Sequence, residues 1–196
     1  MNGAATGKIR IQSTNHLAYA FRDEHIATNR DTYLETLENK NNSIEVDDYV
    51  RDNELDLTKP IVETYSFKDT KDIEVINDKI YFSPLLFLAS EENPFKQETR
   101  EYPIDFGYPV ENKYNISITV PDGYTVESLP KPLNIATGDN IGAFKYIIAN
   151  EGNGIQVSII TNINAPIVTA DYYDVLKDFF KQMLEKENEK IVLKKI

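Results

Sequence analysis

The feature that most constrains the fold is a strict alternation of apolar and polar residues between positions 113 and 120. The apolar positions are Tyr114, Ile116, Ile118 and Val120, and the polar ones between them are Asn115, Ser117 and Thr119. A period of two sends successive side chains to opposite faces of a β-strand, so this stretch predicts a strand with one buried and one solvated face. Pro121-Asp122-Gly123 has turn chemistry and ends the strand, after which residues 124–127 can run back beside it.

Similar signals predict further strands along the chain. They lie at residues 8–12, 44–51, 60–68, 73–82, 143–149, 155–163 and 190–194, with a bulge or split at 77–79. Two pairs of neighbouring strands have turn residues between them. Residues 69–72 suggest a hairpin of 60–68 with 73–82, and Glu151-Gly152-Asn153-Gly154 supplies the positive-φ residues for a hairpin of 143–149 with 155–163.

Two segments have helical periodicity. Apolar positions predict a helix that begins near residue 22 or 29, ends near 38 and is followed by the polar cluster 39–43. A second, amphipathic helix is expected over about residues 171–188, with Thr169 or Asp171 as its N-cap. The short apolar run 84–89 fits one helical turn or a buried connector.

These elements predict an α+β, mainly β fold: an antiparallel β-sandwich of about nine or ten strands, with one helix in the N-terminal half and one near the C-terminus. At 196 residues the chain is long enough for one large β domain or two small ones. We expect a linker over residues 1–7 and a single unit over 8–196. Any boundary inside that unit is expected at about 90–100.

Composition narrows the classes of function. A net charge of −11 disfavours nucleic acid and anionic membranes as partners, since both require a basic surface. The chain has no cysteine, which excludes disulfides, thiolate catalysis and cysteine-ligated metals. No apolar run reaches the roughly 18–20 residues of a membrane span. The first residues have no signal-peptide pattern and read as a linker in a fragment of a longer protein.

Motifs that could carry chemistry are few. The glycines and lysine of residues 3–8 miss the phosphate-loop spacing by one residue, and Ile9 stands where that motif needs Ser or Thr. His16 and His25 match no zinc spacing. Either could act as a base beside Ser13, but surface or packing roles are favoured.

The acidic pairs Asp47/Asp48 and Glu91/Glu92 do not predict two carboxylates on one substrate, because neighbouring residues of a strand face opposite ways. The acidic residues do not form a calcium loop either. Core packing explains most of the 12 tyrosines and nine phenylalanines. Four tyrosines are candidate binding residues, because tyrosine keeps a polar hydroxyl for a partner: Tyr102, Tyr108, Tyr114 and Tyr124. We assign no catalytic, cofactor-binding or metal-binding residue and expect no cofactor.

Several motifs together resemble one protein family. They are Asp56-Leu57-Thr58-Lys59-Pro60, Asn93-Pro94-Phe95-Lys96, the run from Arg100 to Pro109, Pro121-Asp122-Gly123-Tyr124, Ser128-Leu129-Pro130 and the segment 172–195. The chain is similar to the C-terminal region of exported Bacteroidetes proteins that carry a transglutaminase-like (papain-type cysteine) domain together with domains labelled DUF3857 and DUF3858. The resemblance spans nearly the whole chain and contains no catalytic signature.

The resemblance implies a β-sandwich accessory domain, DUF3858-type, in the periplasm or cell envelope. Its neighbour would be the transglutaminase-like domain, whose catalytic cysteine has no counterpart here. The expected function is therefore that of a non-catalytic module that packs on the catalytic domain or holds a protein or envelope polymer for it. Two alternatives remain: a carbohydrate- or peptide-binding β-sandwich, which predicts exposed tyrosines over a groove, and an independent hydrolase, which predicts a histidine or acid pair in a deep cleft.

Overall fold

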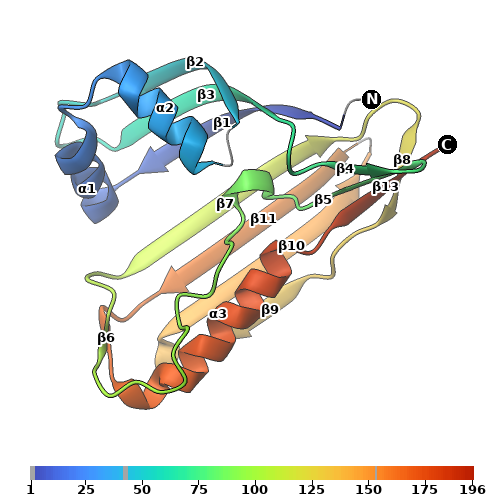
Figure 1. Ribbon diagram of the computed structural model, residues 1–196. Coiled ribbons are helices and arrows are strands. Elements are labelled where there is room, and N and C mark those ends of the chain that lie inside the picture. The colour runs from blue at the N-terminus through green and yellow to red at the C-terminus, as the bar shows by residue number, and fades with distance from the viewer. Residues whose placement is uncertain (1–2, 42–43, 153) are drawn as a thin grey trace. The chain divides into compact units, whose positions relative to one another are not determined.

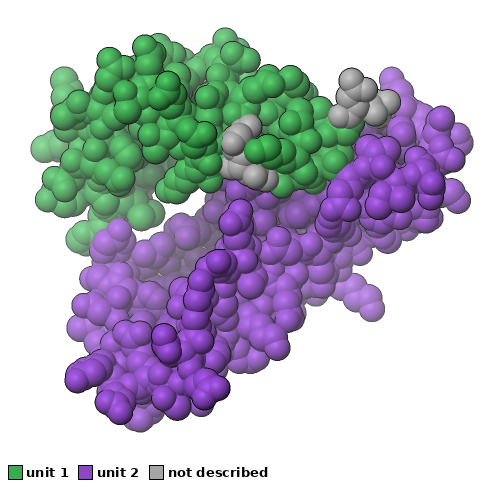
Figure 2. All heavy atoms as spheres, viewed as in Figure 1, with its two compact units in different colours: residues 1–73 green, residues 74–196 purple. Residues whose placement is uncertain are grey.

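A computed structural model describes residues 3–41, 44–152 and 154–196. The chain divides into two compact units, residues 1–73 and 74–196, which Figure 2 shows in separate colours. The fold is α+β and mainly antiparallel β, as the sequence predicts.

The first unit is a three-stranded sheet with two helices, drawn in the blue to blue-green part of the ribbon in Figure 1. Its elements are β1 (Ala5–Ser13), α1 (Asn15–His25), α2 (Arg30–Lys40), β2 (Glu45–Asp52) and β3 (Ile61–Asp69). The strand order is β1-β3-β2, and both pairings are antiparallel. Because β3 lies in the centre, its side chains are largely buried on both faces. The helices pack on this sheet through residues such as Ala18 and Tyr33, which are buried.

Three expectations for this half need correction. Residues 5–7, expected within a linker, extend β1 and pair with the end of β3; residues 1–2 of that expected linker lie outside the described part. The predicted helix is present from the later of its two expected starts as α2, where the side chain of Asn29 accepts a hydrogen bond from the Asp31 N–H at 2.8 Å. The separate helix α1 before it was not predicted. The polar cluster follows α2, although residues 42–43 are not described.

The strand pairing after β3 also differs from the prediction. The hairpin expected across residues 69–72 is wrong, because β1 and β2 already occupy both edges of β3. After that turn the chain enters the second unit, where β4 (Glu74–Ile76) pairs with β5 (Lys79–Phe82). The split that the sequence suggests at 77–79 is present, and Asn77 adopts a positive φ of 54° there.

The second unit is built around a four-stranded antiparallel sheet with the order β7-β11-β10-β9. These strands are β7 (Val110–Thr119), β9 (Leu133–Ala136), β10 (Gly142–Glu151) and β11 (Gly154–Ile163). The helix α3 (Tyr173–Glu187) lies along one face of the sheet (Figure 1). Gly142 lies against this helix, since a Cβ there would be in ordinary van der Waals contact with the ring of Phe179, at 3.4 Å. The core residues Phe144, Ile155, Ile159 and Leu176 are fully buried.

A second four-stranded sheet has the order β4-β5-β13-β8, with β8 (Tyr124–Ser128) and β13 (Ile191–Lys195). A two-residue ladder joins β6 (Ile104–Asp105) to β12 (Ile167–Val168). One-turn 3₁₀ helices occupy Leu86–Leu88, Gly138–Asn140 and Ala170–Tyr172. The expected return of residues 124–127 beside β7 is wrong, since β8 pairs with β13 instead.

The main predictions for this unit are confirmed. The hairpin of β10 and β11 has the predicted pairing, with Gly152 at a φ of 62° in its turn; Asn153 lies outside the described residues. The alternation in β7 leaves Tyr114, Ile116 and Ile118 half-buried and the residues between them exposed. The C-terminal helix is present, but its N-cap is Tyr172, whose side chain makes no capping hydrogen bond. Counted over the described residues, 13 strands replace the expected nine or ten, several of only two or three residues.

Residues 83–106 form an irregular strap that is fixed to α3 at several points. Near the end of the helix, the Ser83 hydroxyl donates to the Glu187 carbonyl oxygen at 2.6 Å. Near its beginning, the Asn93 side chain donates to the Lys177 carbonyl oxygen at 2.8 Å. Phe95 packs with Ile104 and Tyr173 in a buried cluster between strap and helix. The strap therefore holds α3 against its sheet.

Candidate functional site

The two histidines of the sequence both lie on α1. His16 is exposed in the first turn. His25 is half-buried at the last turn, and its ring meets the rings of Phe21 and Tyr33 edge-on, at centroid distances of 4.9 and 5.0 Å. These contacts give His25 a packing role.

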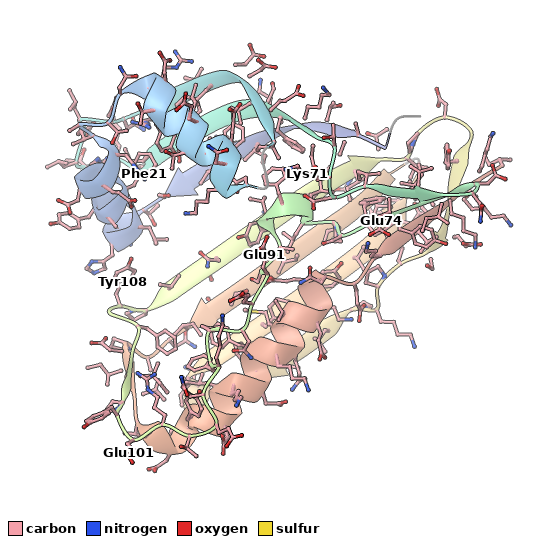
Figure 3. The ribbon with its side chains drawn as sticks, in the orientation of Figure 1. Phe21, Lys71, Glu74, Glu91, Glu101 and Tyr108 are labelled. Atoms are coloured by element: carbon pink, nitrogen blue, oxygen red, sulfur yellow. The ribbon has the colours of Figure 1, made fainter. Side chains whose placement is uncertain are left out.

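The two acidic pairs lie on exposed segments. Asp47 and Asp48 occupy a β-bulge of β2, where the pairing with β3 shifts and Asp48 has a φ of 54°. Glu91 and Glu92 lie in the strap (Figure 3 labels Glu91). The Lys96 ammonium donates to the Glu92 carboxylate and lowers its pKa. Both pairs are therefore in contact with solvent.

The four tyrosines considered for binding differ in exposure. Tyr102 is 76% exposed, whereas Tyr108, Tyr114 and Tyr124 are half-buried. Tyr114 lies on the β7 face that also carries Ile116 and Ile118. Burial and, secondarily, the charge of Glu187 raise its pKa. Of these four rings, that of Tyr102 alone is openly exposed.

One set of interacting titratable side chains, which the sequence did not single out, centres on Glu63. This residue lies on the central strand β3 and is 5% exposed. Its Oε1 accepts a hydrogen bond from the Tyr33 hydroxyl on α2 at 2.5 Å and another from the Tyr49 hydroxyl on β2 at 2.6 Å. One carboxylate oxygen therefore links a helix and a neighbouring strand to the centre of the sheet.

Arg51 connects this carboxylate to the aromatic residues around it. Its Nε donates to the Tyr49 hydroxyl at 2.9 Å, and one of its terminal nitrogens lies 2.9 Å from Glu54 Oε1. The guanidinium carbon lies 4.5 Å from the Tyr33 ring centre and 4.9 Å from that of Phe21, distances typical of cation–π contact. Figure 3 labels Phe21 on α1. We call Phe21, Tyr33, Tyr49, Arg51 and Glu63 the Glu63 cluster.

Burial raises the pKa of the tyrosines in and beside this cluster. Removal from water, followed by the hydrogen bond to Glu63, raises the pKa of both Tyr33 and Tyr49. Burial, together with the charge of Glu63, raises the pKa of the neighbouring Tyr65 to about 12. All three phenols therefore remain neutral at physiological pH, and two of them donate to the carboxylate.

The arrangement has the chemistry of a satisfied polar core. A buried carboxylate is costly unless hydrogen bonds replace its water, and the two phenols supply them. A sequence signal for it exists: Glu63 shares a strand face with Ile61 and Tyr65, so a carboxylate stands where the alternation requires a buried residue. That signal does not say which side chains would meet it, because Tyr33 and Tyr49 are 30 and 14 residues away.

A second buried carboxylate, Glu187, lies at the end of α3. Its Oε2 accepts the N–H of Ser90 in the strap at 3.0 Å, and burial raises its pKa. Over residues 3–41, 44–152 and 154–196, no group of three or more His, Asp or Glu side chains is placed to hold a metal ion. Within the same residues, every helix is too short or too polar to cross a membrane.

Comparison with known proteins gives one family match. The model of a family described as "Domain of Unknown Function with solved-structure structure (DUF3858)" matches residues 78–193, which is more than half of the chain. The matched region lies within the second unit, from β5 to β13. No curated protein and no solved structure matches the chain.

Proposed function

We propose that this chain, which belongs to the DUF3858 family, is a non-catalytic accessory module of a larger exported protein. The observation that carries this proposal is the closure of the Glu63 cluster. Tyr33, Tyr49 and Glu63 are all buried, and their polar atoms bind one another. A reactive group needs a face open to substrate, whereas these side chains hold α2 and β2 on the central strand.

The residues behind the family resemblance support the same conclusion. Asn93 and Phe95 fix the strap to α3, and the Tyr173 hydroxyl donates to the Gln97 carbonyl oxygen at 2.9 Å. Each of these side chains has a role in packing or hydrogen bonding within the second unit. We infer that motifs of this kind determine the fold, and that the catalytic residues belong to another domain of the larger protein.

The proposed context follows from the sequence resemblance. The larger protein would be an exported Bacteroidetes protein with a DUF3857 domain and a transglutaminase-like domain, located in the periplasm or cell envelope. The module would pack on the transglutaminase-like domain or present a protein or envelope polymer to it. The net charge of −11 favours a cationic partner surface over nucleic acid or an anionic membrane.

The test compares the larger protein with and without residues 1–196. We expect removal of the module to lower the melting temperature of the catalytic part, its activity on a protein substrate, or both. Thermal unfolding and turnover would be measured on the two purified proteins under the same conditions. Unchanged stability together with unchanged activity would contradict an accessory role.

A further inference from the structure

The first part of the strap, residues 83–90, is held to the C-terminal end of α3 by three hydrogen bonds. The Ser83 hydroxyl donates to the Glu187 carbonyl oxygen at 2.6 Å, and the Ser90 N–H donates to the carboxylate oxygen Oε2 of Glu187 at 3.0 Å. In return, the Asn188 side chain donates to the Ser90 carbonyl oxygen at 2.9 Å. We call Ser83, Ser90, Glu187 and Asn188 the strap latch.

The carboxyl group of Glu187 is in an unfavourable place for a negative charge. The residue is 5% exposed, and it is the last residue of α3, where the partial negative charge of a helix C-terminus opposes a carboxylate. Among the described residues, the Ser90 N–H is its one hydrogen-bond donor, and no ammonium or guanidinium forms an ion pair with it. A buried carboxylate is costly unless several donors or a cation replace its water. Closure of the strap therefore conflicts with ionisation of this group.

The ionisable groups around this carboxylate do not relieve the conflict. The ammonium of Lys186, the preceding residue, lies 2.7 Å from the Glu189 carboxylate and is neutralised there. Tyr114 of β7 is affected by the charge of the buried carboxylate, and its pKa lies above the ordinary 10.0, so it is neutral at physiological pH. Residues 83–90 contain no ionisable side chain. Glu91, which follows them and is labelled in Figure 3, is exposed to solvent.

We propose that Glu187 makes the latch proton-sensitive: the first part of the strap closes on α3 when the carboxyl group carries a proton, and opens more readily when the group is ionised. A neutral carboxyl group still accepts the Ser90 N–H through its carbonyl oxygen, but it has no charge that requires water. Opening exposes Leu85, which is 2% exposed in the closed strap. The latch thus links exposure of an apolar side chain to the acidity of the surroundings.

The direction of the pH dependence follows from the environment of Glu187. Burial raises its pKa above the ordinary 4.5, and the hydrogen bond from Ser90 lowers it by a smaller amount. The closed strap therefore binds the proton more tightly than the open, solvated strap does. The stabilisation by the proton is complete below pH 4.5 and is lost as the pH rises through the pKa of the closed state. Acid closes this latch, whereas acid usually loosens contacts made by ionised carboxylates.

Amide hydrogen exchange of the full 196-residue chain tests the latch. Protection of residues 85–90, corrected for the intrinsic exchange rate, is compared at pH 5.0 and pH 7.5. We expect at least threefold greater protection at pH 5.0. Glu187→Gln removes the charge and nearly conserves the shape, so its protection should be the same at both pH values within twofold.

Two control variants separate the proton from the other contacts of the latch. Glu185→Gln changes an exposed carboxylate of the same helix, 4.0 Å from Lys181, and should keep the threefold pH dependence. Ser83→Ala removes a hydrogen bond that involves no titratable group, so it should lower the protection by a similar factor at both pH values.

A carbon NMR titration of the Glu187 carboxyl group in the unaltered chain gives a second readout, which needs no variant. A titration midpoint above 4.5, together with pH dependence that disappears in Glu187→Gln, supports the latch. A midpoint at or below 4.5 would overturn it. Protection of residues 85–90 that is equal at the two pH values or greater at pH 7.5 would also overturn it, as would a threefold pH dependence that persists in Glu187→Gln.

Discussion

The two units place different chemistry at the centres of their sheets. In residues 1–73, the middle strand β3 carries Glu63 inward, with two tyrosine hydroxyls and an arginine arranged around it. In residues 74–196, the strands β10 and β11 bury Phe144, Ile155 and Ile159, and α3 buries Leu176. One unit thus has a polar centre and the other an apolar one.

The difference shows which interactions determine the native structure of each unit. An apolar centre gains free energy in proportion to the area removed from water, and it tolerates changes that conserve volume. A buried carboxylate adds little net stability but becomes costly when a partner is lost. We infer that the Glu63 cluster selects one placement of α2 and β2 on β3, whereas stability of the second unit comes from packing.

The largest effect is expected from the apolar centre. Leu176→Ala should lower the free energy of unfolding by about 2–5 kcal/mol, because it leaves a cavity in the buried cluster that Leu176 shares with Phe95 and Ile141. Urea denaturation followed by circular dichroism would measure the change. Val175→Ala, at an exposed position of the same helix, is the control and should cost less than about 1 kcal/mol. A small effect at Leu176 would remove the contrast between the units.

The second test removes the charge from the polar centre. Glu63→Gln should cost about 1–3 kcal/mol, because the amide accepts hydrogen bonds less strongly than a carboxylate and adds a buried donor. Glu45→Gln changes an exposed carboxylate of β2 that pairs with Lys68 and should cost at most about 1 kcal/mol. The comparison uses the same urea denaturation. Equal effects at Glu63 and Glu45 would mean that the buried carboxylate has no special role.

A smaller effect is expected from single hydroxyl groups. Tyr33→Phe and Tyr49→Phe should each cost about 1 kcal/mol, since each removes one hydrogen bond to the same carboxylate oxygen. The double variant should deviate from the sum of the two, because both hydroxyls share one acceptor. Tyr19→Phe, on the exposed face of α1, should be neutral. Strict additivity in this double-mutant cycle would contradict a shared network.

Local patterns made much of the fold predictable. The hairpin of β10 and β11 follows from alternation at Ile155, Val157 and Ile159 and from the turn glycine Gly152, which adopts a positive φ. Both signals act over a few residues, so the sequence contains them directly. The start of α2 follows from a local signal too, because Asn29 is a strong N-cap residue, whereas α1 is not predicted.

Non-local pairing was not predictable in the same way. Local signals predict that residues 73–82 pair with the strand before them and that residues 124–127 pair with β7. The strands in these segments that are paired elsewhere, β5 and β8, instead lie on either side of β13, far along the chain. The Glu63 cluster shows the same limit. Its polar residue is visible in the strand pattern, but its burial depends on Tyr33 and Tyr49 arriving from other elements.

The central claim is that the Glu63 cluster is a closed structural core, and alkaline titration of the chain tests it most directly. Burial raises the pKa of Tyr65 from an ordinary 10.0 to about 12 and raises those of Tyr33 and Tyr49 as well. A folded-state pKa above the unfolded value favours the neutral phenol in the native state. The stabilisation is therefore complete below pH 10 and is lost as the pH rises toward 12.

Phenolate absorbance and circular dichroism would be recorded together from pH 8 to 13. We predict that a group of tyrosines stays neutral above pH 10 until the fold is lost: Tyr33, Tyr49 and Tyr65 in the first unit, and Tyr114 and Tyr146 in the second, whose pKa values burial also raises. Ionisation of every tyrosine near pH 10 without loss of structure would show that the cluster is open to solvent and would contradict the claim.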